Sequence, residues 1–571
     1  MRLQKVRCRF LSPYVKSIGC GKPGGSIAGK GGHAEQALKK KSESQGHLVQ
    51  VTPALSFVGV HLFAVWMQQY GSLLAVISLL QQAIRASSTP HPEEDFPLLH
   101  HKEKTLLLRF QALFYAPLLG IEQLTEFDVK EHPLVTLQGR SYQSTTLRQF
   151  LGHLERIEAA EALMPALLPA TAGQITYVDG HMIAYWARVA MHKGKITMLG
   201  RIMAGSQAVI AHNEVGHALF VTYYPPDMHL SQVIVDYCSQ VAVATGIALF
   251  VIDRAVNAVA LARAFDHQAL GLLCMLDDNE HHGLESFAAT LVDTRADGTK
   301  VYSGQWDMPR PADPRHFVIV EPVAGKTLVY WGTPKVTDVL EVATWPQVYR
   351  ERNERQEHSF KRMSDHGALN TNYGRKKLVG PDRHQQRQRA QLDQALGGAH
   401  KRVATKTEAV NVQQAKVAES VSKGHGQRLA QRQRALVVRE QALQDAQHQH
   451  DHLAAHVDAL SPPGQRADRD FRKQTIMTIR TLLLENALRA FMGVLGARLQ
   501  TQVSLDCLVR LLFERSGARM ETDSQVVYWV NTAGLSVAYQ RLLAEVVDGL
   551  CQMDLKMHGK PIRVCLKEPS P

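Results

Sequence analysis

The segments Gly173-Gln-Ile-Thr-Tyr-Val-Asp179 and Ile247-Ala-Leu-Phe-Val-Ile-Asp253 are two short hydrophobic stretches that each end in an aspartate. β-Branched and aromatic residues of this kind favour strands. The second stretch is apolar at every position before the acid, which is typical of a central strand covered on both faces. Because helical segments separate such strands, the sequence predicts an α/β protein built on a mixed sheet.

Further strands and helices are expected around this pair. The strand candidates are residues 195–199, 207–211, 217–223, 271–276, 316–320, 327–331 and 525–529. The second and third of these should form a hairpin around Asn213-Glu-Val-Gly216. Apolar periodicity predicts helices after Ser144, over 230–245 and over 344–363.

Composition divides the chain into five regions. They are a basic, Gly- and Lys-rich flexible tail (1–50), a mainly helical N-terminal domain (51–170), the mixed-sheet core (171–380), long basic helices rich in Gln, Arg and Ala (381–464) and a helical C-terminal region (465–571). The fourth region nearly lacks aromatic residues, so we expect a long helical hairpin or coiled coil with a thin apolar seam.

The charge of the chain indicates a polyanionic partner. The net charge is +12, and the excess is concentrated in two segments. Residues 1–50 hold ten Lys or Arg against two Asp or Glu, and residues 351–440 hold nineteen against nine. Basic segments beside a mildly acidic body are typical of a protein that contacts a phosphate backbone at selected places.

Cysteine usage and hydropathy indicate the compartment. The seven cysteines are scattered, which argues against a disulfide framework or a structural zinc site and fits a reducing cytosol. The most apolar stretch, residues 54–80, is interrupted by His61, Gln68 and Gln69. We therefore expect a buried helix pair there and no membrane span. No signal peptide is evident at the N-terminus.

Three acids are candidates for chemistry. Asp179 and Asp253 follow strands, and the carboxyl ends of strands are where open α/β sheets place their sites. Glu357 lies on a predicted helix, and Phe360 at i+3 ties it to the buried side. Carboxylates that converge in this way can hold Mg²⁺.

Each acid also has a simpler explanation. Asp179 or Asp253 alone fits a solvated acid that caps a turn, and Glu357 fits a surface ion pair with Lys361. Asp277 and Asp278 also follow a strand-like run and are weaker alternatives to Asp253.

The motifs around these acids resemble those of a known family. Asp179-Gly-His181, Ile252-Asp253-Arg254 and Arg355-Gln-Glu-His-Ser-Phe-Lys-Arg-Met363 resemble the DDE transposases of bacterial insertion sequences, with the acids 74 and 104 residues apart. Shorter likenesses lie at 131–134, 139–146, 204–206, 213–216, 366–369 and 373–374. The resemblance covers about residues 130–380 and, more loosely, the helical tail to 550.

The resemblance implies a fold, an activity and partners. The fold is a ribonuclease H-like catalytic core flanked by helical regions. Asp179, Asp253 and Glu357 would be both catalytic and metal ligands, holding two Mg²⁺ ions for which Mn²⁺ can substitute. The enzyme would cut transposon ends and join them to target DNA, as a homodimer on double-stranded DNA in the bacterial cytoplasm, associated with the nucleoid.

Basic residues near Glu357 are candidates for DNA contacts. Some related transposases carry Tyr-x-x-Arg-x-x-x-Glu-x-x-x-x-x-x-Lys, but Asn353 lies four residues before Glu357 and Ser364 seven after it, so this signature is absent. The predicted phosphate contacts are instead Arg355, Lys361, Arg362, Arg375, Lys376 and Lys377, with Arg383, Arg387 and Arg389 as further candidates for a DNA groove. His181 and Arg254 are predicted to support the acids.

Two other functions fit the same sequence. The chain is also compatible with a degenerate transposase relative that binds DNA or joins other subunits through its long helices without catalysis. A hydrolytic nuclease of the same fold, which cuts without joining, is the third reading. Trp306 and Trp331 are candidates for stacking on a flipped base, although core packing is the commoner role of tryptophan.

Overall fold

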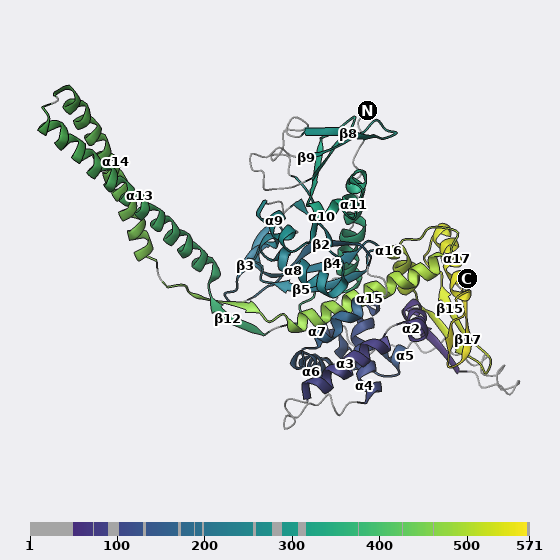
Figure 1. Ribbon diagram of the computed structural model, residues 1–571. Helices are drawn as coiled ribbons and strands as arrows, with labels where there is room; N and C mark the ends of the chain where they lie inside the picture. Colours follow the sequence, from purple (N-terminus) through teal and green to yellow (C-terminus); the bar gives the residue numbers. More distant parts are fainter. Residues whose placement is uncertain are drawn as a thin grey trace.

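The computed structural model describes residues 50–567 except 72, 89–101, 130–132, 170–172, 188, 197–198, 255–258, 277–287, 306–315, 375, 425 and 461. The predicted tail falls outside the described residues, except for residue 50. The predictions for four single residues also fall outside them, namely Asp277, Asp278, Trp306 and Arg375. Figure 1 shows three parts: a sheet-based core, a unit built from residues 50–167 and 472–567, and a long helical arm.

The core is a mixed sheet in the order β3-β4-β2-β6-β7-β11-β10-β9-β8, with β5 paired to β4. Its strands are β2 (Ile175–Ala184), β3 (Lys193–Ile196), β4 (Arg201–Asn213), β5 (Ala218–Tyr224), β6 (Leu249–Ile252), β7 (Gly271–Met275), β8 (Ala288–Thr294), β9 (Lys300–Gln305), β10 (His316–Glu321) and β11 (Leu328–Gly332). The predicted mixed α/β class is confirmed, and so are the predicted hairpin and the strands at β7, β10 and β11.

Strand direction in the core brings two acids to one edge. β2, β4 and β5 are antiparallel neighbours, whereas β2, β6 and β7 run parallel. Parallel neighbours need crossovers, which α8 (Leu230–Thr245) and α9 (Val259–His267) provide. The register pairs Val178 with Ile252, so Asp179 and Asp253 follow side by side.

Both faces of the sheet are covered, as the sequence of β6 predicts. Phe250 and Ile252 belong to a core with residues of α8 and α9, and Leu249 and Val251 belong to a core on the opposite face. The second core includes Trp345 of α11 (Trp345–Arg352). α11 therefore lies on the face next to the two acids. Trp331 is fully buried in the first core and is not available for stacking on a base.

The two ends of the chain form one unit, although the sequence suggested separate regions. β1 (Gln50–Leu55) pairs with β14 (Gly517–Glu521), within a five-stranded sheet ordered β1-β14-β15-β17-β16. The other strands are β15 (Val526–Asn531), β16 (Lys556–Met557) and β17 (Lys560–Lys567). The C-terminal region was predicted to be helical apart from one strand at 525–529. It instead contributes four strands to this sheet.

The α-helices of this unit are α2 (Val58–Tyr70), α3 (Leu73–Ser88), α4 (Glu103–Tyr115), α5 (Leu134–Gln138), α6 (Ser144–Arg156), α7 (Ala159–Leu163), α15 (Arg472–Gly496), α16 (Leu505–Leu508) and α17 (Val537–Cys551). α15 runs beneath the core and along this unit (Figure 1). Among the described residues no single helix is long and apolar enough to cross a membrane. Only α2 and α3 taken together reach that length, and they are bent by 66°.

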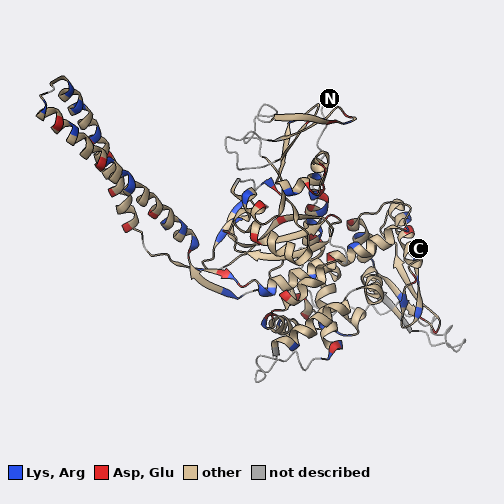
Figure 2. Cartoon of the chain, viewed as in Figure 1, with Lys and Arg blue, Asp and Glu red and all other residues tan. Residues whose placement is uncertain are grey.

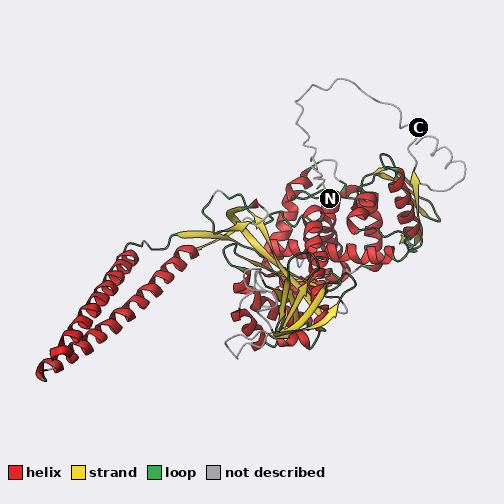
Figure 3. Cartoon of the chain, turned by 90° about the horizontal axis from the view of Figure 1, so that it is seen from above, coloured by secondary structure: helices red, strands yellow, loops and turns green. Residues whose placement is uncertain are grey.

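The arm is a long pair of helices, α13 (Arg383–Ser422) and α14 (Gly426–Asp458), as predicted for residues 381–464. It extends away from the body in two views (Figures 1 and 3). At its base β12 (Lys377–Pro381) pairs antiparallel with β13 (Gln465–Arg469). Both ends of the arm therefore return to the same point on the body.

Phe491 of α15 tests the union of the two chain ends. Its ring lies 5.5 Å from that of Phe63 and 5.3 Å from that of Trp66, and it is fully buried. We expect Phe491→Ala to lower the free energy of unfolding by about 3–5 kcal/mol, because it leaves a cavity between the two ends. Urea denaturation measures the loss. Val494→Ala, on the same helix but partly exposed, should change it by less than about 0.5 kcal/mol. Equal effects of the two substitutions would contradict this packing.

Candidate active site

The three predicted acids converge on one guanidinium. Arg352 Nη1 lies 3.3 Å from Asp179 Oδ2, and Arg352 Nη2 lies 3.6 Å from Asp253 Oδ1 and 3.2 Å from Glu357 Oε1. The Arg352 side chain is only 9% exposed, whereas the carboxylates are 25, 37 and 51% exposed. The acids are thus the solvent-exposed part of the site, and the arginine lies buried beside them.

Tyr349 and Arg352 are site residues that the sequence analysis missed. The Tyr349 hydroxyl donates to Asp253 Oδ1 at 3.4 Å, and the Arg352 guanidinium lies 5.8 Å from the Tyr349 ring centre. Tyr349-x-x-Arg352 has the spacing of the first half of the related signature, but Glu357 comes one residue too late for the second half. A search that allowed one inserted residue would have found them.

A π-helical turn absorbs the extra residue. α11 continues as a π-turn over Asn353–Glu357 and then as α12 (His358–His366). π-Turns inside α-helices hold one additional residue and occur often at functional sites. The wider turn returns Glu357 to the face that carries Tyr349 and Arg352, which explains why an ion pair forms between residues five apart.

Gln356 fixes the π-turn against the sheet. Its side chain is fully buried, and its amide donates to the carbonyls of Tyr177 in β2 and Ile210 in β4, at 3.3 and 3.2 Å. Because Gln356 faces the sheet, Glu357 faces the acids. Among the ion pairs of the described residues, Glu357 pairs with Arg352. The surface ion pair with Lys361, which was the simpler explanation for Glu357, is not among them.

Burial dominates the electrostatics of Asp179. Burial raises the pKa of Asp179 to about 6, and the negative charges of Asp253 and Glu357 add to the increase. The Arg352 guanidinium and the Gly180 amide oppose it. Burial alone would lower the pKa of Arg352, but the three carboxylates and Tyr349 raise it. The site therefore carries an excess of negative charge, which a cation would neutralise.

His181 and Gly180 lie within a strand, because β2 continues past Asp179 to Ala184. The His181 ring stacks on Phe360 of α12 and its Nε2 lies 2.7 Å from Asn370 Oδ1, which joins β2 to the glutamate helix. A Cβ at Gly180 would lie 2.4 Å from Gln207 Nε2, so a larger residue here would require the Gln207 side chain to move.

The predicted DNA-contacting residues are dispersed. Arg362 is 12% exposed and bonds Glu485 at 2.7 Å, so it ties α12 to α15 and is not presented to DNA. Arg355 is half-buried, whereas Lys361 and Lys377 are exposed. Lys376 is 61% exposed and lies 3.6 Å from Asp470. Arg254, beside Asp253, is exposed.

The donor chemistry of the site suits a hard divalent cation. Mg²⁺ prefers carboxylate oxygens, and the three acids supply them from β2, the end of β6 and the helix. Within the described residues no group of three or more His, Cys, Asp or Glu stands as a preformed metal site. At this position the Arg352 guanidinium lies among the three carboxylates.

No protein-family model matches the chain, and no curated protein matches it.

The raised pKa of Asp179 has a consequence for stability. Because the folded state holds the Asp179 proton more tightly than the unfolded state, this group lowers stability as pH rises from about 4 to about 6. In EDTA, the free energy of unfolding of Asp179→Asn minus that of wild type should increase by about 2–3 kcal/mol between pH 4 and pH 7. Urea titrations at both pH values measure this difference. A constant difference would contradict the burial of this carboxyl.

Deleting a residue tests the π-turn. Deletion of the exposed Asn353 should convert the turn to regular α-helix while keeping Tyr349, Arg352 and Glu357 on one face. We expect the melting temperature to fall by only a few degrees. Deletion of the exposed Arg350, within α11, should rotate Tyr349 away from Arg352 and prevent stable folding. Equal effects of the two deletions, measured by thermal denaturation, would contradict the role of the turn.

Proposed function

We propose that this protein is a DDE transposase with a ribonuclease H-like core, which cuts DNA ends and joins them to a target by metal-assisted phosphoryl transfer. The observation that carries the proposal is the convergence of Asp179, Asp253 and Glu357 around Arg352. They come from positions far apart in the sequence, so a chance solvated acid at each position does not explain their meeting.

The strand order supports the fold. The path β5-β4-β2-β6-β7 has three antiparallel strands followed by two parallel to the first, with α8 crossing between them. This is the arrangement expected of a ribonuclease H-like core. The strands β8 to β11 then lie between the core and the glutamate helix, as an inserted element would.

The residues of the site have distinct roles in the proposed reaction. Asp179, Asp253 and Glu357 would hold the Mg²⁺ ions, and Mn²⁺ would substitute. Bound metal ions would supply charge neutralisation at the reacting phosphate. The Tyr349 hydroxyl orients Asp253, and Gln356 sets the direction of Glu357. Such positioning accounts for much of the catalysis in phosphoryl transfer.

Arg352 contacts all three acids, and its guanidinium compensates part of their charge. With metal ions bound by the acids, Arg352 would lie beside them on α11, where its planar fork would suit a DNA phosphate. A homodimer that holds two DNA ends is part of the proposal.

The proposal predicts loss of catalysis without loss of DNA binding. Asp179→Ala, Asp253→Ala and Glu357→Ala should each abolish Mg²⁺-dependent cleavage and joining, because each removes a metal ligand, and should leave duplex affinity within about threefold. The substrate is a plasmid that carries the gene with its flanking DNA, and gel analysis of nicked and joined products measures activity.

Asp365→Asn, an exposed acid at the end of α12, is the matched control and should retain activity. Full activity of any of the three alanine variants would contradict the assignment. Cleavage without joined products would instead indicate a hydrolytic nuclease, and DNA binding without Mg²⁺-dependent cleavage a degenerate relative.

A further inference from the structure

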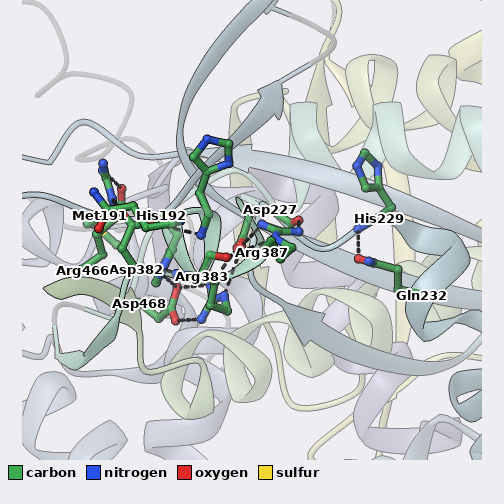
Figure 4. A network of polar contacts seen from close by, with 12 residues as sticks. Met191, His192, Asp227, His229, Gln232, Asp382, Arg383, Arg387, Arg466 and Asp468 are labelled. Atoms are coloured by element: carbon green, nitrogen blue, oxygen red, sulfur yellow. Dashed lines mark hydrogen bonds and ion pairs between the residues drawn. The ribbon is translucent and has the colours of Figure 1, made fainter. Parts of the chain in front are cut away.

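The arm is fixed to the core by a partly buried cluster of charged residues at its base. Asp227, which follows β5 and is 8% exposed, accepts hydrogen bonds from Arg383 at 2.7 and 3.1 Å and from Arg387 at 2.7 Å (Figure 4). Burial opposes ionisation of Asp227, but its bonds to Arg383 hold its pKa below the ordinary value. Arg383 and Arg387 are therefore anchors of the arm and not the groove-lining residues that the sequence suggested.

The same cluster binds both strands at the base of the arm. Arg383 also pairs with Asp468 of β13, and its backbone amide donates to His192 Nε2 at 3.1 Å. His192 Nδ1 lies 3.0 Å from Asp468 (Figure 4). Asp382 caps the first turn of α13 and pairs with Arg466. These contacts hold the base of the arm in one orientation relative to the core.

Charge is distributed unevenly along the arm. Its distal half, residues 401–439, holds nine Lys or Arg against two Asp or Glu. The returning segment 440–460 holds four Asp or Glu and no Lys or Arg. In Figure 2 the blue ribbon segments that mark Lys and Arg accordingly occur on both helices toward the tip. The excess positive charge thus lies at the end far from the anchor.

Most of these distal cations are not used to hold the helices together. Arg432 and Arg439 are exceptions, because they bond Ser420 and the Ala409 carbonyl on the facing helix, at 2.7 and 2.8 Å. Lys401, Arg402, Lys406, Arg428 and Arg434 are exposed, and no ion pair joins them to an acid among the described residues. An excess of exposed Lys and Arg side chains is suited to binding an anionic polymer.

We propose that the distal half of the arm binds the phosphate backbone of duplex DNA outside the active site. The inference rests on the proposed function, because that function supplies duplex DNA as the partner. α13 has 40 residues and is therefore about 60 Å long, so the contact would lie well beyond the cleaved phosphate. The fixed base makes the arm a rigid extension that holds DNA at a set position relative to the acids.

Charge complementarity favours DNA over other occupants. The cations lie on both helices over a length of about 30 Å, and duplex DNA presents about one negative charge per 1.7 Å along its axis. The exposed large apolar residues of the same region are few, namely Val412, Val421 and the adjacent pair Val437 and Val438, and they form no continuous apolar face of the kind that membrane-surface helices present.

The test neutralises five of the exposed distal cations that form no ion pair among the described residues. The variant carries Lys401→Gln, Arg402→Gln, Lys406→Gln, Arg428→Gln and Arg434→Gln, since glutamine preserves helix propensity. The control exchanges Lys for Arg and Arg for Lys at the same positions and keeps the charge. Fluorescence anisotropy with a 60-base-pair duplex of mixed sequence, in EDTA over a range of NaCl concentrations, gives the affinity and its salt dependence. Circular dichroism verifies that both variants keep their helices.

We expect the neutralised variant to bind at least about tenfold more weakly at 100 mM NaCl, with the slope of log K against log salt reduced by about 2 to 4. The control should bind as wild type does. Unchanged affinity and slope in the neutralised variant would overturn the inference, as would an equal loss in the control.

Other occupants give different results. Weaker binding to anionic lipid vesicles, or altered sedimentation of the protein, with DNA affinity unchanged would indicate a membrane or a second copy and overturn the inference. If wild type binds the duplex and shows acid-dependent cleavage while the arm variant matches it in affinity, only the arm inference fails. If wild type does not bind duplex DNA, the proposed function fails with it.

Discussion

Three carboxylates close together at the edge of a sheet repel one another, and in this protein the Arg352 guanidinium compensates that repulsion. The compensation is incomplete, because burial and the neighbouring acids still raise the pKa of Asp179. A site with this excess of negative charge favours cations, and a divalent ion would neutralise it more fully than one guanidinium. The proposed chemistry depends on this exchange of one cation for another.

The fold places each acid independently. Parallel pairing of β2 and β6 puts Asp179 beside Asp253, and the core on the adjacent sheet face holds α11 over them through Trp345. The π-turn and Gln356 then decide which side of the helix Glu357 occupies. A change in the pairing of β2 with β6, in the packing of α11 or in the π-turn would separate the acids. The geometry of the site therefore depends on the whole core and not on a local motif.

Much of this arrangement could be predicted from the sequence. The apolar stretch before Asp253, the hairpin and the long helical arm follow from local patterns, and the structure has them. The role of Arg352 could not be predicted from the fixed spacing of the related signature, because the π-turn shifts Glu357 by one residue. No local sequence pattern predicts such a turn. The pairing of β1 with β14 joins residues more than 450 positions apart, and composition carries no signal for such contacts. The engagement of Arg362, Arg383 and Arg387 in ion pairs likewise depends on partners distant in sequence.

Anomalous diffraction at the manganese edge, from crystals of the protein grown with Mn²⁺ and duplex DNA, tests the central claim most directly. The account predicts manganese peaks among the oxygens of Asp179, Asp253 and Glu357, with the Arg352 side chain turned away from them. A guanidinium still seated among the three carboxylates, with no manganese peak there at millimolar Mn²⁺, would contradict it.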